Sequence, residues 1–236
     1  RVLNHGSAVL WAEFAPDGGY VVTAGTDGMA RVWQASDGAP VGQPARHSDR
    51  VLMARFSPDR EGRFFVTACQ DGIARVWETR SGLSASQPFS HRRPIHTAAF
   101  SHDGSQVLTA SDDGIAVIWQ QPDRQRYFSH NQRVTSLQFS PDSTRLASTS
   151  FDGTAMLFDL ATGQPTRPLL HESRVHSASF SADGKWLVTA SDKGASVWDL
   201  ESDRVPEQIE SGTNIWQACF SASADVLSLL GLTEIF

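Results

Sequence analysis

TASDDGIAVIW, residues 109–119, is the stretch that decides the fold, because near-copies of it return along the whole chain. The copies are TAGTDGMARVW at 23–33, TACQDGIARVW at 67–77, STSFDGTAMLF at 148–158 and the shorter TASDKGASVW at 189–198. Each copy follows a histidine, and successive histidines lie 42, 44, 39 and 41 residues apart. A repeat of this length is typical of propeller blades or of helical solenoids.

The residues between the histidines indicate strands rather than helices. An apolar residue stands four positions after each histidine and a phenylalanine nine positions after it, which is spacing typical of a strand. Turn sequences such as SPDS and SADG follow, and the DG turns between β-branched runs predict hairpins. The second strands are almost continuously apolar, as in sheets covered on both faces. The pattern predicts an all-β fold, a β-propeller of four-stranded antiparallel blades.

The unbroken period predicts a single domain over residues 1–236. The five full repeats are 5–46, 47–90, 91–129, 130–170 and 171–211, and a partial sixth covers 212–236. Two arrangements stay open. One is a six-bladed ring in which residues 1–4 complete the last blade. The other, which we favour, is a piece of a seven-bladed or larger propeller, because the chain opens without methionine and the sixth copy lacks its histidine, aspartate turn and tryptophan.

Composition argues against a membrane protein, a nucleic-acid binder and a disulfide framework. No apolar run approaches the roughly 18 residues that a membrane span requires. The net charge is −6 and no basic block is present, so the electrostatic footprint of nucleic-acid binding is missing. The two cysteines, Cys69 and Cys219, fit a reducing compartment. We therefore expect a soluble, cytoplasmic protein.

The repeats resemble those of the WD-repeat family of β-propellers, over essentially the whole chain, and their SPDG-like turns and ARVW strands look like bacterial members. A blade of that family carries a histidine, a serine or threonine, a turn aspartate and a tryptophan. The resemblance implies that these residues form one structural hydrogen-bond network in each blade, with the aspartates of the first three blades buried. The residues are His5, Thr23, Asp27 and Trp33; His47, Thr67, Asp71 and Trp77; His91, Thr109, Asp113 and Trp119; His130, Ser148 and Asp152; and His171, Thr189 and Trp198.

Two copies depart from the family pattern. The fourth has Phe158 in place of the tryptophan, so one hydrogen bond of its network is absent. The fifth is one residue shorter: counting from Thr189 puts Lys193 in the aspartate position, and counting from Trp198 puts Asp192 there. Because a half-satisfied buried polar network lowers stability, we expect the fourth and fifth blades to be the less stable ones.

Repetition separates a structural role for these residues from a catalytic one. Histidine, threonine and aspartate would suit a hydrolase, but a catalytic constellation occurs once, whereas this set recurs along the chain. HESRVH at 171–176 is similar to the zinc-protease motif, yet its histidines are five apart on a strand instead of four apart on a helix. No phosphate-binding glycine loop, paired-cysteine zinc spacing or GxSxG elbow is present. We expect no catalytic site, no metal and no cofactor.

Three functions follow from the resemblance. The first, which we favour, is a non-catalytic protein–protein interaction scaffold. The second is a regulatory sensor appended to a signalling kinase or NTPase. The third is a propeller enzyme, which would need acidic or histidine groups converging at the channel mouth. Since a fold alone does not decide a function, the flanking sequence would separate the first two. The expected partner is a protein or peptide, with no nucleic acid and no membrane.

Register predicts a partner-binding face where the first strands begin and the DG turns end. Positions that vary between copies while their neighbours repeat are released from the shared structural role. Arginine and tryptophan are frequent interface anchors, and arginines in an acidic protein would select an acidic or phosphorylated segment, although such arginines can also be merely solvated. The face comprises Arg50, Arg133 and Arg174; two positions further, on the same side by strand alternation, His96, His176 and Trp216; and before the turns, Thr26, Gln70, Asp112 and Phe151.

Overall fold

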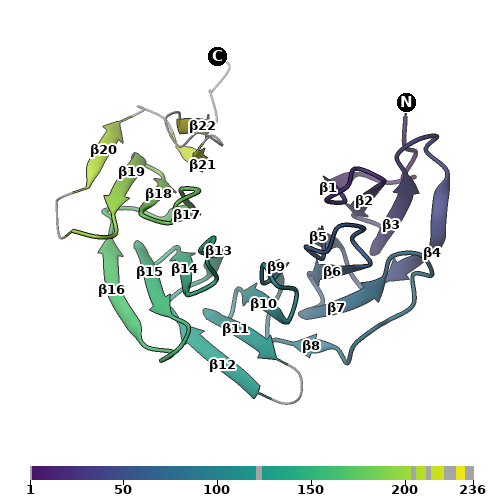
Figure 1. Ribbon diagram of the computed structural model, residues 1–236, viewed down its shortest axis with the longest axis horizontal. Coiled ribbons are helices and arrows are strands. Elements are labelled where there is room, and N and C mark those ends of the chain that lie inside the picture. Colours follow the sequence, from purple (N-terminus) through teal and green to yellow (C-terminus); the bar gives the residue numbers. More distant parts are fainter. Residues whose placement is uncertain (1, 121–123, 203–205, 211–213, 221–226, 232–236) are drawn as a thin grey trace. The chain divides into compact units, whose positions relative to one another are not determined.

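The structure is a computed structural model that describes residues 2–120, 124–202, 206–210, 214–220 and 227–231. The described residues form five four-stranded sheets, which we call blades 1 to 5, and one two-stranded sheet, blade 6 (Figure 1). The prediction of an all-β fold with five full antiparallel repeats and a partial sixth is confirmed. Among the described residues, no helix is long and apolar enough to cross a membrane.

The chain forms two compact units, residues 1–128 and 129–236. The single domain expected over residues 1–236 stays a prediction. Blades 1 to 3 are β1 (Val9–Phe14), β2 (Tyr20–Gly25), β3 (Met29–Gln34) and β4 (Pro40–Arg46); β5 (Val51–Phe56), β6 (Phe64–Cys69), β7 (Ile73–Glu78) and β8 (Phe89–Ser90); and β9 (Ile95–Phe100), β10 (Gln106–Ser111), β11 (Ile115–Gln120) and β12 (Arg124–Ser129). Blades 4 to 6 are β13 (Val134–Phe139), β14 (Arg145–Ser150), β15 (Thr154–Asp159) and β16 (Pro165–Leu170); β17 (Val175–Phe180), β18 (Trp186–Ser191), β19 (Gly194–Asp199) and β20 (Glu207–Glu210); and β21 (Ile215–Phe220) and β22 (Leu227–Gly231).

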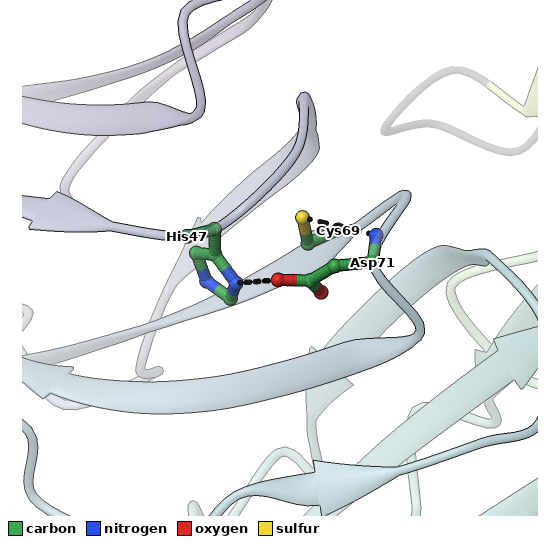
Figure 2. Close-up of side chains that lie close together, drawn as sticks. All are labelled: His47, Cys69 and Asp71. Carbon is green, nitrogen blue, oxygen red and sulfur yellow. Dashed lines mark hydrogen bonds and ion pairs between the residues drawn. The ribbon is translucent and has the colours of Figure 1, made fainter.

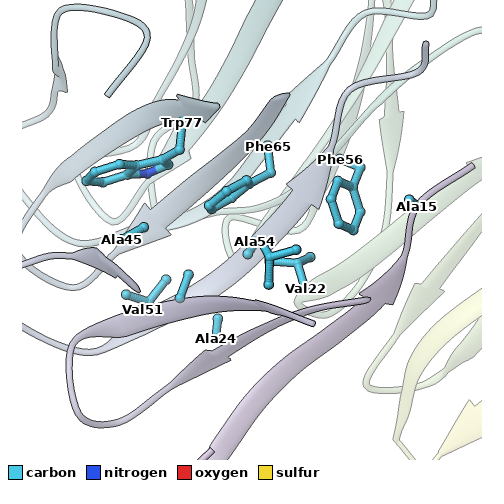
Figure 3. Close-up of a cluster of buried hydrophobic side chains, with 11 residues drawn as sticks. Ala15, Val22, Ala24, Ala45, Val51, Ala54, Phe56, Phe65 and Trp77 are labelled. Carbon is cyan, nitrogen blue, oxygen red and sulfur yellow. The ribbon is translucent and has the colours of Figure 1, made fainter. Parts of the chain in front are cut away.

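Blade 2 shows why the second strands are apolar on both sides. Side chains alternate along a strand, so neighbouring residues of β6 point to opposite faces of the sheet. Phe65 packs into a cluster with Val22 of blade 1 (Figure 3). The next residue, Val66, packs into a second cluster with Ile95 of blade 3. Both faces of the sheet are therefore covered by neighbouring blades of the first unit, as the apolar second strands predicted.

Blade 1 leaves one such face uncovered. Phe14 is 65% exposed, whereas Phe56, at the same register in blade 2, is 7% exposed. Val9 is likewise exposed, and its counterpart Val51 is buried. Val51 and Phe56 are covered because they pack against blade 1. The equivalent residues of blade 1 form an apolar face that is open to solvent.

The first strand of every blade contains a β-bulge. In blade 5, Val175 pairs with Ser191 and Ser177 with Ala190, so His176 is the extra residue. The equivalent extra residues are Leu10, Leu52, His96, Thr135 and Trp216. A bulge interrupts strand alternation and redirects a side chain. We expected strand alternation to place His96, His176 and Trp216 on the side of the arginines. Strand alternation cannot be the reason for their placement, because these three residues are the bulge residues themselves.

Candidate functional site

The stretch 109–119 supplies most of the hydrogen-bond network of blade 3. The Trp119 indole N–H donates to Thr109 Oγ1 at 2.8 Å, and this hydroxyl lies 2.8 Å from His91 Nε2. His91 Nδ1 lies 3.0 Å from Asp113 Oδ2. Because a carboxylate only accepts hydrogen bonds, Nδ1 carries the imidazole proton and Nε2 accepts from the hydroxyl. The network thus runs in one direction, from the third strand to the turn.

Blade 2 repeats this geometry. The successive distances are 2.9 Å from Trp77 Nε1 to Thr67 Oγ1, 2.7 Å from Thr67 Oγ1 to His47 Nε2, and 3.3 Å from His47 Nδ1 to Asp71 Oδ2. Asp71 also accepts the backbone N–H of Ser48 at 3.2 Å. The carboxylate therefore joins the start of the first strand to the turn between the second and third strands.

Cys69 adds a thiol to the blade 2 network, and its Sγ lies within 4.8 Å of ligand atoms of His47 and Asp71 (Figure 2). The thiol donates to the Asp49 carbonyl at 3.2 Å and accepts the Asp71 N–H at 3.3 Å. Ser111 makes the same two kinds of backbone bond in blade 3. Burial raises the pKa of the Cys69 thiol to about 12, so the thiol stays protonated. His47, Cys69 and Asp71 are a variant of the blade network, with cysteine where blades 3, 4 and 5 have serine, at 111, 150 and 191. This repeated serine position is not among the network residues predicted from the sequence.

Blade 1 holds its histidine in the opposite orientation. His5 Nδ1 lies 2.7 Å from Thr23 Oγ1, while Nε2 lies 3.2 Å from Asp27 and 2.7 Å from Arg31 Nη1. The position that carries a thiol or hydroxyl in blades 2 to 5 is Gly25 here, and a Cβ atom at Gly25 would collide with the imidazole. The ring therefore occupies space that a side chain fills elsewhere.

The turn aspartates of the first three blades differ in burial. The side chains of Asp71 and Asp113 are almost fully covered. Asp27 is exposed and bonds Arg31 at 2.7 Å. The expectation that all three are buried is wrong for Asp27, because the turned imidazole places this carboxylate toward an arginine at the surface.

Blade 4 lacks the indole donor because Phe158 replaces tryptophan. Its His130 Nε2 lies 2.7 Å from Ser148 Oγ, and Nδ1 lies 3.3 Å from Asp152 Oδ2. Thr154 donates to the same carboxylate at 2.6 Å. The carboxylate end of the network is thus intact and the indole end is missing.

Blade 5 lacks the carboxylate instead. Trp198, Thr189 and His171 Nε2 are joined by contacts of 2.8 Å each. His171 Nδ1 bonds the carbonyl of Leu169 at 3.1 Å. Neither Lys193 nor Asp192, the two candidates from the sequence, fills the aspartate position. Lys193 bonds the exposed Glu172, and Asp192 bonds His176. The shorter turn of this blade therefore moves its aspartate out of the network.

Stability is expected to fall as the pH drops below about 6.5, the ordinary imidazole pKa. Burial lowers the pKa of His47, His130 and His171, so these imidazoles take up protons less readily in the folded state than in the unfolded chain. Burial opposes ionisation of Asp152, but hydrogen bonds, first from Thr154, lower its pKa below 3.8. All these folded-state pKa values are depressed, so their contributions are complete above the unfolded values and are lost as the pH falls.

Urea unfolding between pH 7.5 and pH 4.5 measures this effect. His171→Gln is expected to flatten the pH dependence below about 6.5, and His102→Gln, at an exposed histidine, is the matched control that leaves it unchanged. A free energy of unfolding that stays level or rises from pH 7.5 to pH 5.5 would contradict the expectation.

The predicted partner-binding positions are paired by one backbone hydrogen bond in each blade. The residue before the turn aspartate donates its N–H to the carbonyl of the residue three positions after the histidine. The bonds are Thr26 to Ala8, Gln70 to Arg50, Asp112 to Pro94, Phe151 to Arg133 and Asp192 to Arg174, at 2.9–3.2 Å. The two variable positions of each blade therefore lie side by side.

In the second unit, five of the predicted positions lie together as a cluster. Two guanidinium groups lie over the ring of Phe151, with the guanidinium carbons of Arg133 and Arg174 at 5.2 and 5.1 Å from the ring centre. His176 meets Phe151 edge-on at 5.7 Å and lies 4.3 Å from the ring of Trp216, which is 46% exposed. These five residues form the aromatic–arginine cluster, and they come from blades 4, 5 and 6.

The remaining predicted positions lie in the first unit. His96 Nε2 lies 2.9 Å from Asp112 Oδ1 in blade 3, and His176 Nε2 bonds Asp192 Oδ1 at 2.6 Å in blade 5. In both blades a bulge histidine therefore lies next to the aspartate at the equivalent turn position. Thr26, Arg50 and Gln70 belong to blades 1 and 2, and Arg50 and Gln70 are exposed.

Comparison with known proteins agrees with this repeated geometry. The family model described as WD domain, G-beta repeat, matches residues 1–34, 38–78, 85–120, 123–159 and 163–199. The chain is 36% identical over 55 residues to small ribosomal subunit protein RACK1z of Arabidopsis thaliana, and equally to small ribosomal subunit protein RACK1 of Brassica napus. Each match covers 23% of this chain and 17% of the relative. Since the family model covers most of the chain and blades 1 to 5 each carry the hydrogen-bond network or a variant of it, the chain belongs to the WD-repeat family.

Proposed function

We propose that this chain is a non-catalytic protein-interaction module that binds an acidic segment of a partner protein at the aromatic–arginine cluster. WD-repeat domains are typically protein-interaction scaffolds. The observation that carries the site is the packing of two guanidinium groups on Phe151 beside the exposed Trp216. Cation, aromatic ring and apolar surface are thus available within one small area.

The chemistry of the cluster favours a carboxylate or a phosphoryl group. A guanidinium group beside an aromatic ring can bind an anion in a bidentate way through the N–H donors at its edge. Arg174 is exposed and makes no ion pair with a carboxylate among the described residues. The chain as a whole is acidic, with a net charge of −6, so this local positive charge is not a general property of its surface.

The histidine, hydroxyl and aspartate groups support a binding role over a catalytic one. They recur in successive blades and are engaged in structural hydrogen bonds. A regulatory propeller attached to a signalling kinase or NTPase, as in the bacterial proteins that the repeats resemble, would use the same surface. That reading, phosphorylation of the partner segment and a cytoplasmic location remain predictions from the sequence.

Fluorescence anisotropy with an array of short labelled peptides tests the proposal. The peptides carry aspartate and glutamate, phosphoserine, or lysine around one central leucine. We expect acidic or phosphorylated peptides to bind, with an affinity that falls between about 50 and 200 mM salt. Arg133→Gln with Arg174→Gln should weaken binding by about tenfold or more, equivalent to about 1.4 kcal/mol.

The matched control replaces two exposed arginines of the first unit, Arg60→Gln with Arg80→Gln, and removes the same charge. The control should leave the affinity unchanged. Equal loss in both double variants, or equal binding of the lysine peptides, would refute a specific acidic site at the cluster.

A further inference from the structure

A cavity of about 550 Å³ opens between blades 2 and 3 of the first unit. Four aromatic side chains contribute to its walls, namely Phe64, Phe89, Phe100 and Trp119. Its remaining lining consists of aliphatic, glycine, proline, serine and glutamine residues, with no charged group among them. Pockets of about 300–1,000 Å³ with apolar walls and a few polar groups are typical ligand sites.

The cavity exists because blade 2 has a short outer strand. In blade 1 the seven residues of β4 pair along β3, with Val41 opposite Val32. In blade 2 the pairing of the two-residue β8 with β7 includes Ala74 opposite Phe89 and goes no further along β7 (Figure 1). Beyond Ala74, the outer edge of β7 is met by residues 83–86 of a loop, where Trp77 and Ser84 form an isolated antiparallel bridge and the Ala85 N–H donates to the Val76 carbonyl at 2.8 Å.

This loop leans toward blade 1. The Gln43 N–H donates to the Ser81 carbonyl at 3.0 Å, and a Cβ atom on Gly82 would collide with the backbone of Gln43. Ala85 and Ser86 bond the backbone of Val76 at 2.8 and 3.3 Å. Residues with small side chains therefore face Val76.

Blade 1 shows what normally fills this place. Val41 faces Val32 and packs against the apolar cluster between blades 1 and 2. In blade 2 the residues that face Val76, the counterpart of Val32, are Ala85 and Ser86, so the equivalent volume between blades 2 and 3 is left open. Blade 2 has Phe89 opposite Ala74 where blade 1 has Ala45 opposite Ala30, and Phe89 lines the space that stays open.

A smaller depression of about 230 Å³ shares Phe64, Phe100 and Gly104 with the cavity. Its other lining residues include Asp59, Arg63 and Asp103, so it is charged where the cavity is uncharged. An apolar recess beside a charged one suits a peptide, whose backbone and neighbouring side chains are polar, better than a wholly apolar small molecule.

We infer that the cavity binds one uncharged, aromatic or large aliphatic side chain carried by an extended segment of a partner protein. The uncharged aromatic walls select the side chain, and the charged depression receives the polar groups next to it. The site lies on blades 2 and 3 and is independent of the aromatic–arginine cluster.

NMR titration of the ¹⁵N-labelled chain tests the inference, with the indole N–H of Trp119, a residue that lines the cavity and donates this N–H to Thr109, as the reporter. The probes are capped Gly-Trp-Gly, Gly-Leu-Gly and Gly-Lys-Gly, together with N-acetyl-tryptophanamide. We expect saturable shifts with the tryptophan and leucine tripeptides and none with the lysine tripeptide. Gly-Trp-Gly should bind several-fold more tightly than the amide alone, because the segment also contacts the depression.

Two variants fill the cavity from opposite walls, Ala85→Trp on blade 2 and Ser105→Trp on blade 3, both at exposed residues. Each should weaken tripeptide binding by about tenfold or more. Ala161→Trp, at an exposed turn residue of the second unit, is the matched control. Spectra of blade 1, in the same unit but outside the cavity lining, that match those of the parent show that the variants fold.

Four results would overturn the inference. The tripeptides could leave the Trp119 signal unmoved, or bind the filled variants as well as the parent. The amide could bind as tightly as Gly-Trp-Gly, which would make the cavity a small-molecule site. Self-association of the parent that Ala85→Trp abolishes would make a second copy the occupant. Arg133→Gln with Arg174→Gln should leave tripeptide binding intact, so that failure of the acidic-segment proposal is seen separately.

Discussion

Replacing Phe56 by alanine is expected to lower the free energy of unfolding by about 3–5 kcal/mol, the usual cost of removing a buried aromatic ring. Phe56 lies in the apolar cluster between blades 1 and 2, with its ring 6.3 Å from that of Phe65 in an edge-on contact (Figure 3). The surrounding strands are held by their ladders and cannot close the resulting cavity. Urea unfolding followed by tryptophan fluorescence and by circular dichroism measures the loss.

Phe14→Ala is the matched control because Phe14 has the same register one blade earlier and is 65% exposed. Its replacement should change the free energy of unfolding by no more than about 0.5 kcal/mol. If both variants of the 236-residue chain are equally destabilised, the face of blade 1 that carries Phe14 is covered in solution, and its description as an open face is wrong.

Thr109→Val is expected to destabilise the chain by about 1–3 kcal/mol for each of two buried groups that lose their partner. Valine has the shape of threonine without the hydroxyl. The Trp119 N–H loses its acceptor at 2.8 Å, and His91 Nε2 loses its donor at 2.8 Å. Thermal and urea unfolding of the variant measure the combined loss.

Ser148→Ala separates the contribution of the hydroxyl–histidine bond from that of the indole–hydroxyl bond. The hydroxyl of Ser148 lies 2.7 Å from His130, and Phe158 offers no indole donor in this blade. The loss should therefore be about 1–3 kcal/mol, for one orphaned group. A loss equal to that of Thr109→Val would show that the indole bond contributes nothing to stability.

The repeated turns and strand patterns were sufficient to predict the sheets. The DG turns, the phenylalanine nine residues after each histidine and the apolar second strands are local signals, and the structure has the five four-stranded sheets that they predict. The side-by-side placement of the variable positions follows from a backbone bond that recurs with the period, and their role as a partner-binding face stays a prediction. Their assembly into one cluster in the second unit depends on bulges that strand alternation does not reveal.

What could not be predicted depends on single residues acting across space. Gly25 lets His5 turn over, because the absence of one side chain leaves room for a ring that is distant in sequence. The shortened turn of blade 5 gives Asp192 to His176 instead of His171. The short β8 follows from a loop held against blade 1. In each case a contact between residues that are distant in sequence decides between local conformations that the sequence alone does not distinguish.

The β-bulges have a consequence for how this surface can change. Each bulge supplies one residue that the strand ladder does not need for pairing, so its side chain is released from the rules that restrict its neighbours. The six bulge residues are leucine twice, histidine twice, threonine and tryptophan, while the residues on either side stay small or apolar in most copies. At the exposed bulge residues Leu10 and Trp216 mutation can therefore sample new chemistry while the scaffold is preserved, whereas Thr135 bonds the Val175 carbonyl of the next blade and His176 is buried. The fold separates the residues that maintain its architecture from those that diversify its recognition.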